Sequence, residues 1–581
     1  MSDKKYYIGL DIGTSSVGWA VTDEHYNVIR RKGKDMWGAR LFDEAKPAAD
    51  RRTRRIDRRR LQREKQRIAY LNHVFEPEIN KIDPGFFQRL EDSKYYKEDK
   101  TIIQPYGIFA DPEYTDVDYY DLEDGFPTIF HLRKALIECK EKKYDVRLVY
   151  LAILNIFKHR GHFLYPNLKE GSIADLGELL ENLNTLFYEE FEENMPMVAD
   201  INKLQDILTD QSVDNSIRLN RVLDETGSPK KEKEYKQIVG MWNLMCGLKG
   251  KFADIFILDE FPEDKAKFSM NFGDTDYEDL ILEAEELLCQ ESFDLLMAMK
   301  EVYDWCALAT IMIENGKPYE YLSLARCAKY EQHKKDLKIL KKLYRKYLPE
   351  KYDDMFRKMN NDSYSAYIGS VNSKYGKVRR GAKKYDDFFK NIEKDMNAIK
   401  KQAPEELDCQ YVLDRIKKNE FLPKQSTTDN GIIPNQLHKA ELRKILENAE
   451  EYLPFLKEEG DKGLTASERL LQIFSFQLPY YVGPLKKSEN SNAWVERKDY
   501  SGPVYPWNLE EKVDIEKTNE NFINRLIGEC SYIQGAKVLP KSSLLYERFM
   551  VLNELNPLKI NDQEIPVELK QAIFKDLFMR D

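Results

Sequence analysis

A run of arginines constrains this chain more than any other feature of its sequence. Residues 50–79 read DRRTRRIDRRRLQREKQRIAYLNHVFEPEI, without glycine and without proline before Pro77. Nothing before Pro77 breaks a helix, so the stretch predicts one long helix. Residues 51–67 hold 10 bases and 2 acids, a net charge of +8. A helix with so much unbalanced positive charge is destabilised unless a polyanion neutralises it.

Five arginines share one side of the predicted helix. At 100° per residue they fall within an arc of ~120° and span ~22 Å: Arg52, Arg55, Arg59, Arg63 and Arg67. Leu61, Ile68 and Phe75 follow on roughly the opposite side, which predicts a narrow apolar seam that docks the helix. Guanidinium groups bind phosphates bidentately and keep their charge at physiological pH, so the stripe predicts a nucleic-acid backbone as its partner. A solvated helix laced with salt bridges is the alternative, but only Asp57 and Glu64 could pair with the bases.

The N-terminal residues predict a small β-meander. Residues 6–32 hold three β-forming stretches, YYIGLDI, VGWAVTD and NVIRRK, separated by the turn sequences GTSS and DEHYN. Asp11 lies at the end of the first stretch, where we expect it to be buried. An ATPase of the actin, sugar-kinase and heat-shock type would use the following turn to hold nucleotide phosphates, whereas a ribonuclease H-like nuclease would use Asp11 to hold a metal ion. The arginine helix has no use in such an ATPase and favours the nuclease; a turn-capping aspartate is a further alternative.

The rest of the chain predicts a mostly α protein of several lobes. At 581 residues it is too long for one core, and after residue 130 its apolar residues follow helical spacing. Residues 170–300 hold 30 acids and 12 bases, a net charge of −18, which predicts a separate helical lobe held away from nucleic-acid phosphates. No apolar run approaches the ~18 residues of a membrane span, no apolar signal region starts the chain, and the seven cysteines are scattered. We therefore expect a cytoplasmic protein without membrane contact, disulfides or a zinc site.

A series of ordered motifs resembles one family. After KKYYIGLDIGTSSVGWAV and the arginine helix come PTIFHLRKAL, KHRGHFL, TTDNGIIPNQLHKAEL, YLPFL, LPYYVGPL, PWNLEE and KVLPKSSLLYE. In this order they are similar to the RNA-guided DNA endonucleases of type II CRISPR systems, over essentially the whole chain except the acidic segment. The resemblance implies six parts: a first RuvC-like nuclease segment (1–48), an Arg-rich bridge helix (49–82), the first part of a recognition lobe (83–169), an acidic inserted helical lobe (170–310), the continued recognition lobe (311–500) and the start of a further helical recognition domain (501–581).

The resemblance also implies roles for single residues. Asp11 matches the first catalytic aspartate of the RuvC fold, which is a ligand of Mg²⁺. Eight further residues are expected to bind RNA through the bridge helix, the turn that receives the repeat-derived duplex and two later loops: Arg55, Arg59, Arg63, Arg67, Arg160, Gly161, Tyr480 and Arg497. Arg52 joins them by its place in the stripe. Glu64 stands where an arginine is usual, so we expect one phosphate contact fewer.

Several of these positions also have plainer interpretations. His159 and His162 could suggest a metal site, but without a neighbouring cysteine or acid pair we expect packing or RNA contact. Tyr480 could stack on a base or ribose, or simply anchor its loop. Gln477, just before it, stands where a basic residue is common in the family, which weakens the expectation of a phosphate contact there.

We therefore expect the N-terminal portion of such an endonuclease, acting as a monomer. Its expected partners are guide RNA, made of CRISPR RNA with trans-activating RNA, and target DNA. The sequence lacks the family's later RuvC segments and its HNH nuclease, so we expect the chain alone to be catalytically incomplete. Two alternatives stay open, a naturally truncated guide-RNA-binding protein without catalysis and an actin-like ATPase.

Overall fold

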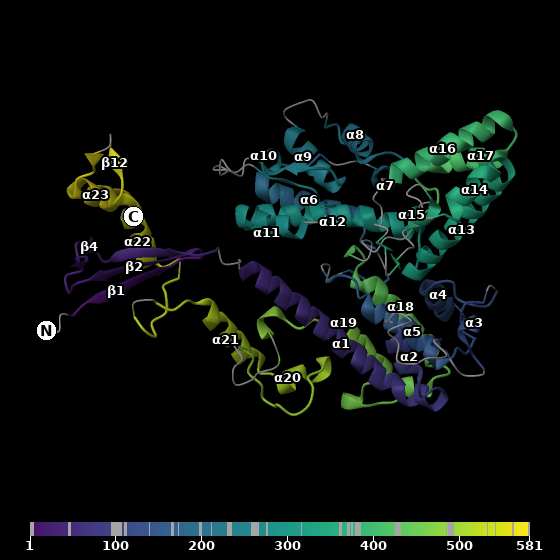
Figure 1. Cartoon of the computed structure of the whole chain (residues 1–581), viewed down its shortest axis with the longest axis horizontal. Helices are drawn as coiled ribbons and strands as arrows, with labels where there is room; N and C mark the ends of the chain where they lie inside the picture. The colour runs from purple at the N-terminus through teal and green to yellow at the C-terminus, as the bar shows by residue number, and fades with distance from the viewer. Residues whose placement is uncertain are drawn as a thin grey trace. The chain divides into compact units, whose positions relative to one another are not determined.

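A computed structural model gives the architecture of the chain (Figure 1). The described residues are 5–43, 48–93, 107–109, 113–121, 123–138, 140–163, 168–171, 173–196, 200–210, 212–228, 235–256, 267–274, 277–314, 317–358, 363–368, 372–373, 376–377, 385–424, 431–483, 485, 493–530, 533–540, 542–560 and 563–578. Among these, the side chains of residues 48–53, 277–279, 282, 286, 366, 372–373, 376–377, 385–387 and 480 lie outside the description. The chain divides into two compact units, residues 1–164 with 173–434 and residues 165–172 with 435–581. Helices dominate both units, which confirms the mostly α prediction.

A three-stranded antiparallel sheet begins the first unit. Its strands are β1 (Tyr7–Ile12), β2 (Ser16–Thr22) and β5 (Trp37–Leu41), in the order β1-β2-β5. The predicted third strand at residues 27–32 is confirmed only in part: Val28 forms an antiparallel bridge with Thr22 of β2, and β3 (Arg30–Arg31) pairs with β4 (Lys34–Asp35). Tyr26, Lys32 and Gly33 have left-handed backbone angles, with φ of 64°, 50° and 76°, so turns bound this stretch at both ends and keep it short. The third strand of the sheet is β5 instead, which the sequence did not predict.

Neither face of this sheet is covered by the described residues. Neighbouring side chains of a strand point to opposite faces, yet Tyr7 is 50% exposed and Ile8 is 58% exposed. Trp37 on β5 is 66% exposed. A small sheet needs an apolar face packed on something else for independent stability. Here the described contacts are the hydrogen-bonded ladder and the stacked rings of Tyr7 and Tyr26.

One helix of 35 residues, α1 (Ala48–Ile82), contains the whole arginine run and continues through Pro77. Its second half is packed, with Leu71, Phe75 and Ile79 all at 0% exposure. The predicted apolar seam is wrong at Leu61, which is 57% exposed. The helical periodicity correctly predicted the side of α1 that carries apolar residues. In the first half of α1, however, no described element covers that side, so Leu61 is exposed.

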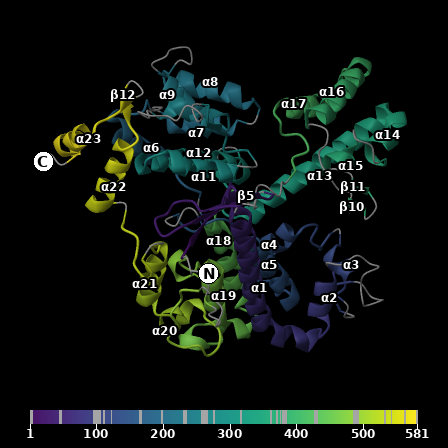
Figure 2. The same cartoon turned by 60° about the vertical axis from the view of Figure 1, so that its left-hand side comes forward.

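The four helices that come next along the chain after α1 also belong to the first unit. They are α2 (Phe86–Asp92), α3 (Asp116–Tyr119), α4 (Ile129–Glu138) and α5 (Val146–Lys158). Helix α5 is capped by Asp145, whose carboxylate accepts a hydrogen bond from the Arg147 N–H at 2.7 Å. Ten of its 13 residues are buried, and it packs directly against α1 (Figure 2).

The acidic segment has a hydrophobic core of its own. Its elements are α6 (Leu176–Phe191), α7 (Ile201–Thr209), α8 (Asn215–Glu225), α9 (Lys236–Met245), β6 (Gly250–Lys251), α10 (Phe252–Ile255), β7 (Ser269–Met270), α11 (Tyr277–Leu287) and α12 (Gln290–Met312). Trp242 and Met299 lie at the centre of a cluster drawn only from residues 174–313. The indole Nε1 of Trp305 donates to the Ala174 carbonyl at 2.8 Å, which closes the segment on itself. A core built from one continuous stretch is what an independently folding lobe requires.

A second helical group completes the first unit. It comprises β8 (Ile313–Glu314), β9 (Lys317–Pro318), α13 (Leu322–Tyr347), α14 (Pro349–Phe356), α15 (Tyr364–Ile368), β10 (Asn372–Ser373), β11 (Gly376–Lys377), α16 (Tyr385–Gln402) and α17 (Leu407–Lys417). Asp336 of α13 is fully buried and accepts hydrogen bonds from the Leu422 N–H at 2.9 Å and the Tyr411 hydroxyl at 2.8 Å. These bonds join α13 to α17 and to the segment after it.

The second unit is helical as well. It contains α18 (Asn435–Ala449), η4 (Pro454–Lys457), η5 (Asp461–Gly463), α19 (Ala466–Ser475), η6 (Tyr480–Val482), η7 (Pro506–Asn508), α20 (Leu509–Lys512), α21 (Ile515–Leu526), α22 (Leu544–Leu555), β12 (Lys559–Ile560), β13 (Gln563–Glu564), α23 (Val567–Ile573) and η8 (Phe574–Phe578). Glu170 attaches residues 165–172 to α18 through ion pairs with Lys439 at 2.6 Å and Arg443 at 3.0 Å. Within the described residues of both units, no helix is long and apolar enough to span a bilayer.

The separate core of residues 174–313 leads to a prediction. Replacing residues 174–312 with a short flexible linker should leave the affinity for the guide RNA expected from the resemblance within a few fold, because the lobe's negative charge opposes phosphate binding. Filter binding at fixed salt measures the affinity, and far-ultraviolet circular dichroism of the isolated segment checks that it folds alone. A loss of tenfold or more on deletion would show that the lobe belongs to the binding surface.

Candidate nucleic-acid interface

The arginines of the first half of α1 reach solvent. Arg55 and Arg63 are exposed and Arg59 is half-buried, whereas the side chain of Arg52 lies outside the described residues. None of the three is ion-paired to an acid within the part of the chain that the structure describes. Although Arg63 reaches solvent, neighbouring atoms partly desolvate its guanidinium and lower its pKa, and the charge of Arg59 lowers it further. Among the described residues these three arginines are therefore a row of like charges without an ion-pair partner.

The row continues from α1 onto the turn that follows α5. Burial lowers the pKa of Arg67, with further lowering from Arg63 and Arg60 that Glu64 partly offsets. Burial, aided by the charge of Arg67, lowers the pKa of Arg160 to about 9. Arg160 still carries its proton at neutral pH, but at a cost in free energy that a bound anion would relieve. Two half-buried guanidinium groups from distant parts of the sequence thus form one cationic site.

The antiparallel packing of α5 on α1 brings these two arginines together. The Tyr150 hydroxyl of α5 donates to Asn72 Oδ1 of α1 at 2.7 Å. The ring of Tyr150 lies 5.7 Å from that of Phe75. Following α5 towards its end while following α1 back towards its beginning leads to Arg160 beside Arg67. The sequence predicted both residues as RNA ligands, but only this packing makes them neighbours.

The turn after α5 has a constrained backbone. Gly161 has a φ of +72°, in the left-handed region that favours glycine. The guanidinium of Arg160 lies over the Phe163 ring, 4.3 Å from its centroid. The His162 N–H donates to the Ile433 carbonyl at 3.0 Å, and its Nε2 lies 3.2 Å from the Ile432 oxygen. His162 therefore anchors the turn through the backbone, which agrees with the packing interpretation rather than with a metal site.

A second cationic row, which the sequence reasoning missed, lies on α13. At 100° per residue, four side chains fall within an arc of ~60°: Lys334, Lys338, Lys341 and Arg345. None of the four has an ion-pair partner among the described residues. On the flank of this row, Lys342 pairs with Asp408 at 2.6 Å and Lys346 pairs with Glu406 at 2.9 Å. The spacing i, i+4, i+7, i+11 was the signal that could have revealed the row.

The remaining RNA-binding candidates belong to the second unit. Tyr480 begins η6, but its side chain lies outside the described residues. Arg497 is held by its own loop, because its Nε donates to the Asp499 carbonyl at 3.0 Å. Its guanidinium lies 5.3 Å from the centre of the Tyr500 ring. Arg497 thus lies in a basic loop of the second unit and is fixed by contacts within that loop.

Asp11 lies on β1, opposite Gly18 of β2. The expectation that it is buried is wrong, because every residue of β1 is exposed and neither sheet face is covered. In the described parts of the chain no three His, Cys, Asp or Glu residues gather closely enough to hold a metal ion. A Mg²⁺ site needs several oxygen ligands in near-octahedral geometry. The described residues alone do not fit such a site, and Asp11 supplies one carboxylate only.

Comparison with known proteins decides the family. Residues 176–581 match the family model described as the REC lobe of CRISPR-associated endonuclease Cas9, and residues 51–83 match the model of its bridge helix. The chain belongs to the Cas9 family. The Cas9 bridge-helix match covers α1 and ends at Asp83, and the REC-lobe match begins with α6. Membership of a Cas9 endonuclease family sets aside the actin-like ATPase.

Two curated relatives cover almost the whole chain, and both are named CRISPR-associated endonuclease Cas9. The relative from Streptococcus mutans serotype c is 35% identical over 596 residues, which is 99% of this chain and 41% of the relative. The relative from Listeria innocua serovar 6a is 34% identical over 597 residues, 99% of this chain and 42% of the relative. The chain thus spans about two-fifths of the length of these Cas9 proteins.

The lowered pKa of Arg160 predicts a pH dependence of anion binding. An anion favours the protonated guanidinium, so its affinity should be highest below pH 9 and fall as the pH rises above it. Inorganic sulfate is a suitable probe because its own charge does not change in this range. Calorimetric titration at pH 8 and pH 10 should show several-fold weaker binding at pH 10.

The control for this titration is Arg160→Gln. This variant should lose most of the change in sulfate affinity between pH 8 and pH 10, and any change that remains comes from lysines. Equal pH dependence in the wild type and in Arg160→Gln would show that Arg160 is not the titrating group.

Proposed function

We propose that this chain binds the backbone of a guide RNA along a row formed by Arg55, Arg59, Arg63, Arg67 and Arg160. One observation carries the proposal: burial, aided by the charge of a neighbouring guanidinium, lowers the pKa of Arg63, Arg67 and Arg160, and these neighbours run in sequence from Arg59 on α1 to Arg67 beside Arg160. Cations placed side by side repel one another in the free protein, and phosphates that neutralise them remove this repulsion. Arginine suits this role because it binds phosphate through two parallel hydrogen bonds.

Further contacts complete the proposed interface. Arg52 extends the row at the start of α1, and Gly161 lets the backbone of the turn approach the RNA. Tyr480 and Arg497 would add contacts from the second unit. In this proposal the protein acts as a monomer in the bacterial cytoplasm, and it grips the hybrid of guide and target DNA through its backbone shape while base pairing reads the sequence.

Charge reversal of two stripe residues tests the proposal. The double variant Arg59→Glu/Arg63→Glu should weaken binding of a guide RNA, transcribed from the repeat and trans-activating RNA of the same locus, by more than tenfold. Each lost phosphate contact should also reduce the slope of log K against log salt by about 0.7–0.9. Filter binding at several salt concentrations measures both quantities.

The control is Arg54→Glu/Arg58→Glu, which changes the net charge equally. On a helix Arg54 and Arg58 lie roughly opposite the stripe, and both are exposed. If both double variants weaken binding equally, net charge rather than the stripe determines the affinity. Neutralising Lys334 and Lys338 in the same titration shows whether the α13 row belongs to the interface.

We further propose that Asp11 contributes one carboxylate to a Mg²⁺ site of the complete nuclease. In that site the metal would activate water for phosphodiester hydrolysis. The support is its place at the end of β1, before the turn in which the Gly13 N–H donates to the Ser16 carbonyl at 2.8 Å, together with membership of an endonuclease family. Asp11 would supply this carboxylate from β1, which is an edge strand of the three-stranded sheet.

The single carboxylate predicts that residues 1–581 do not cut DNA. Purified chain with guide RNA, matched duplex and Mg²⁺ should leave both labelled strands intact on a denaturing gel, because one ligand cannot hold the ion in place. Guide-dependent product that disappears in Asp11→Ala would contradict the prediction. Restoring cleavage with the remainder of a relative's chain, added separately, would distinguish a nuclease part from a non-catalytic guide-RNA-binding protein.

A further inference from the structure

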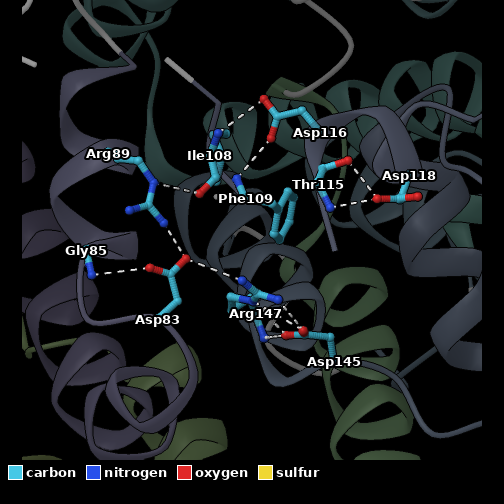
Figure 3. A network of polar contacts seen from close by, with 10 residues as sticks. All are labelled: Asp83, Gly85, Arg89, Ile108, Phe109, Thr115, Asp116, Asp118, Asp145 and Arg147. Carbon is cyan, nitrogen blue, oxygen red and sulfur yellow. Dashed lines mark hydrogen bonds and ion pairs between the residues drawn. The ribbon is translucent and has the colours of Figure 1, made fainter. Parts of the chain in front are cut away.

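A buried network of ion pairs fixes the end of α1 (Figure 3). Asp83, the first residue after α1, is 7% exposed. Its carboxylate accepts hydrogen bonds from Arg89 of α2 and from Arg147 Nη1 of α5, the latter at 3.3 Å. Its other oxygen accepts from the Gly85 N–H at 3.3 Å. One carboxylate thus joins three helices.

The network extends to the segment before α3. Arg89 Nε donates to the Ile108 carbonyl at 3.1 Å, and Asp116 accepts from the N–H groups of Ile108 and Phe109 at 3.1 and 2.9 Å. Arg147 is 1% exposed and its guanidinium lies 5.2 Å from the centre of the Phe109 ring. All of these groups are satisfied, so the network has one well-defined arrangement.

Arg147 has a second carboxylate partner. Its Nη2 donates to Asp145 Oδ2 at 2.6 Å and its Nε to Asp145 Oδ1 at 3.0 Å. The guanidinium is therefore held between the start of α5 and the end of α1. A lysine could not make these contacts together, because an ammonium group lacks the planar fork.

Apolar packing alone does not determine how far α5 is shifted along α1. Ten of the 13 residues of α5 are buried, and such an evenly apolar helix can pack in more than one register. Buried polar pairs are the groups that select one register, since any other leaves a charge without a partner. In α5 two side chains do this towards α1: Arg147 through Asp83 and Tyr150 through Asn72.

The register matters at the far end of the pair. Arg160 lies 13 residues beyond Arg147 and Arg67 lies 16 residues before Asp83, so both lie roughly 20–24 Å from the network along their helices. A shift of one turn would move Arg160 by ~5.4 Å relative to Arg67. That shift exceeds the length of a guanidinium–phosphate hydrogen bond, ~2.7–2.9 Å, so the two groups could no longer share one phosphate.

We propose that Asp83 and Arg147 are positioning residues that set the register of α5 on α1 and thereby hold Arg67 and Arg160 at the spacing needed to bind one phosphate. This inference rests on the proposed function, because it concerns the same cationic row. It goes beyond that function in assigning part of the affinity to residues buried about 20 Å away that never touch the ligand.

A double-mutant cycle with inorganic sulfate tests the inference. Arg147→Lys should weaken sulfate binding at least fivefold while the protein remains folded by circular dichroism. In an Arg160→Gln background the same substitution should change the affinity less than twofold, because the group that it positions is gone. A merely structural role would not produce this dependence on Arg160.

The control is Asp336→Asn, which removes a fully buried carboxylate from the other helical group of the same unit. It should lower the midpoint of urea unfolding, as Arg147→Lys does, but leave sulfate affinity within twofold. Asp83→Asn provides a second variant of the network. If both network variants fail to fold, Tyr150→Phe is used in their place, because it removes only the hydrogen bond to Asn72. Its effect on sulfate affinity is then compared with and without Arg160→Gln.

The outcomes separate the two proposals. Wild-type protein that binds sulfate, with network variants that are less stable but bind it equally well, would overturn the positioning role alone. Wild-type protein that does not bind sulfate would overturn the phosphate site at Arg67 and Arg160, and the positioning role with it.

Discussion

The contact between α5 and the second half of α1 determines what the rest of the first unit can do. Leu71, Phe75 and Ile79 are buried there completely, and each such side chain contributes about 1.5–3 kcal/mol of hydrophobic free energy. This contact holds α1 without using its first half. A single helix therefore has two different halves, since one belongs to the core and the other presents charged side chains to solvent.

Opposite charges are separated along the sequence. The arginine row lies on α1 and on the turn after α5, whereas the net charge of −18 lies in residues 170–300, most of which pack around a core of their own. The net charge of −10 for the whole chain hides this arrangement. Local electrostatics decides where a polyanion can approach, and it differs in sign between the two regions.

The sequence predicted elements well where a pattern was long and failed where a neighbour mattered. The absence of an early helix breaker over 30 residues predicted α1, and helical periodicity predicted the side on which its arginines lie. Periodicity could not show that Leu61 has nothing to pack against, because that depends on another element. The third strand of the sheet was expected at residues 27–32 and is β5 instead. Turns at Tyr26 and Lys32 bound the expected stretch, and the left-handed backbone angles of these turns cannot be predicted from tyrosine and lysine. The meeting of Arg67 with Arg160 depends on tertiary packing across 93 residues, which no local pattern contains.

The unsupported first half of α1 links ligand binding to helix formation. About five turns of helix carry mutually repelling charges there, and Ile56 and Leu61 gain no burial, being 63% and 57% exposed. Such a segment has little to oppose unwinding except its own hydrogen bonds. A polyanion that neutralises the charges would also act as a template for the helix, so the measured binding enthalpy would include the enthalpy of helix formation. Calorimetric signatures of this interface would then resemble those of coupled folding and binding rather than those of two rigid bodies docking.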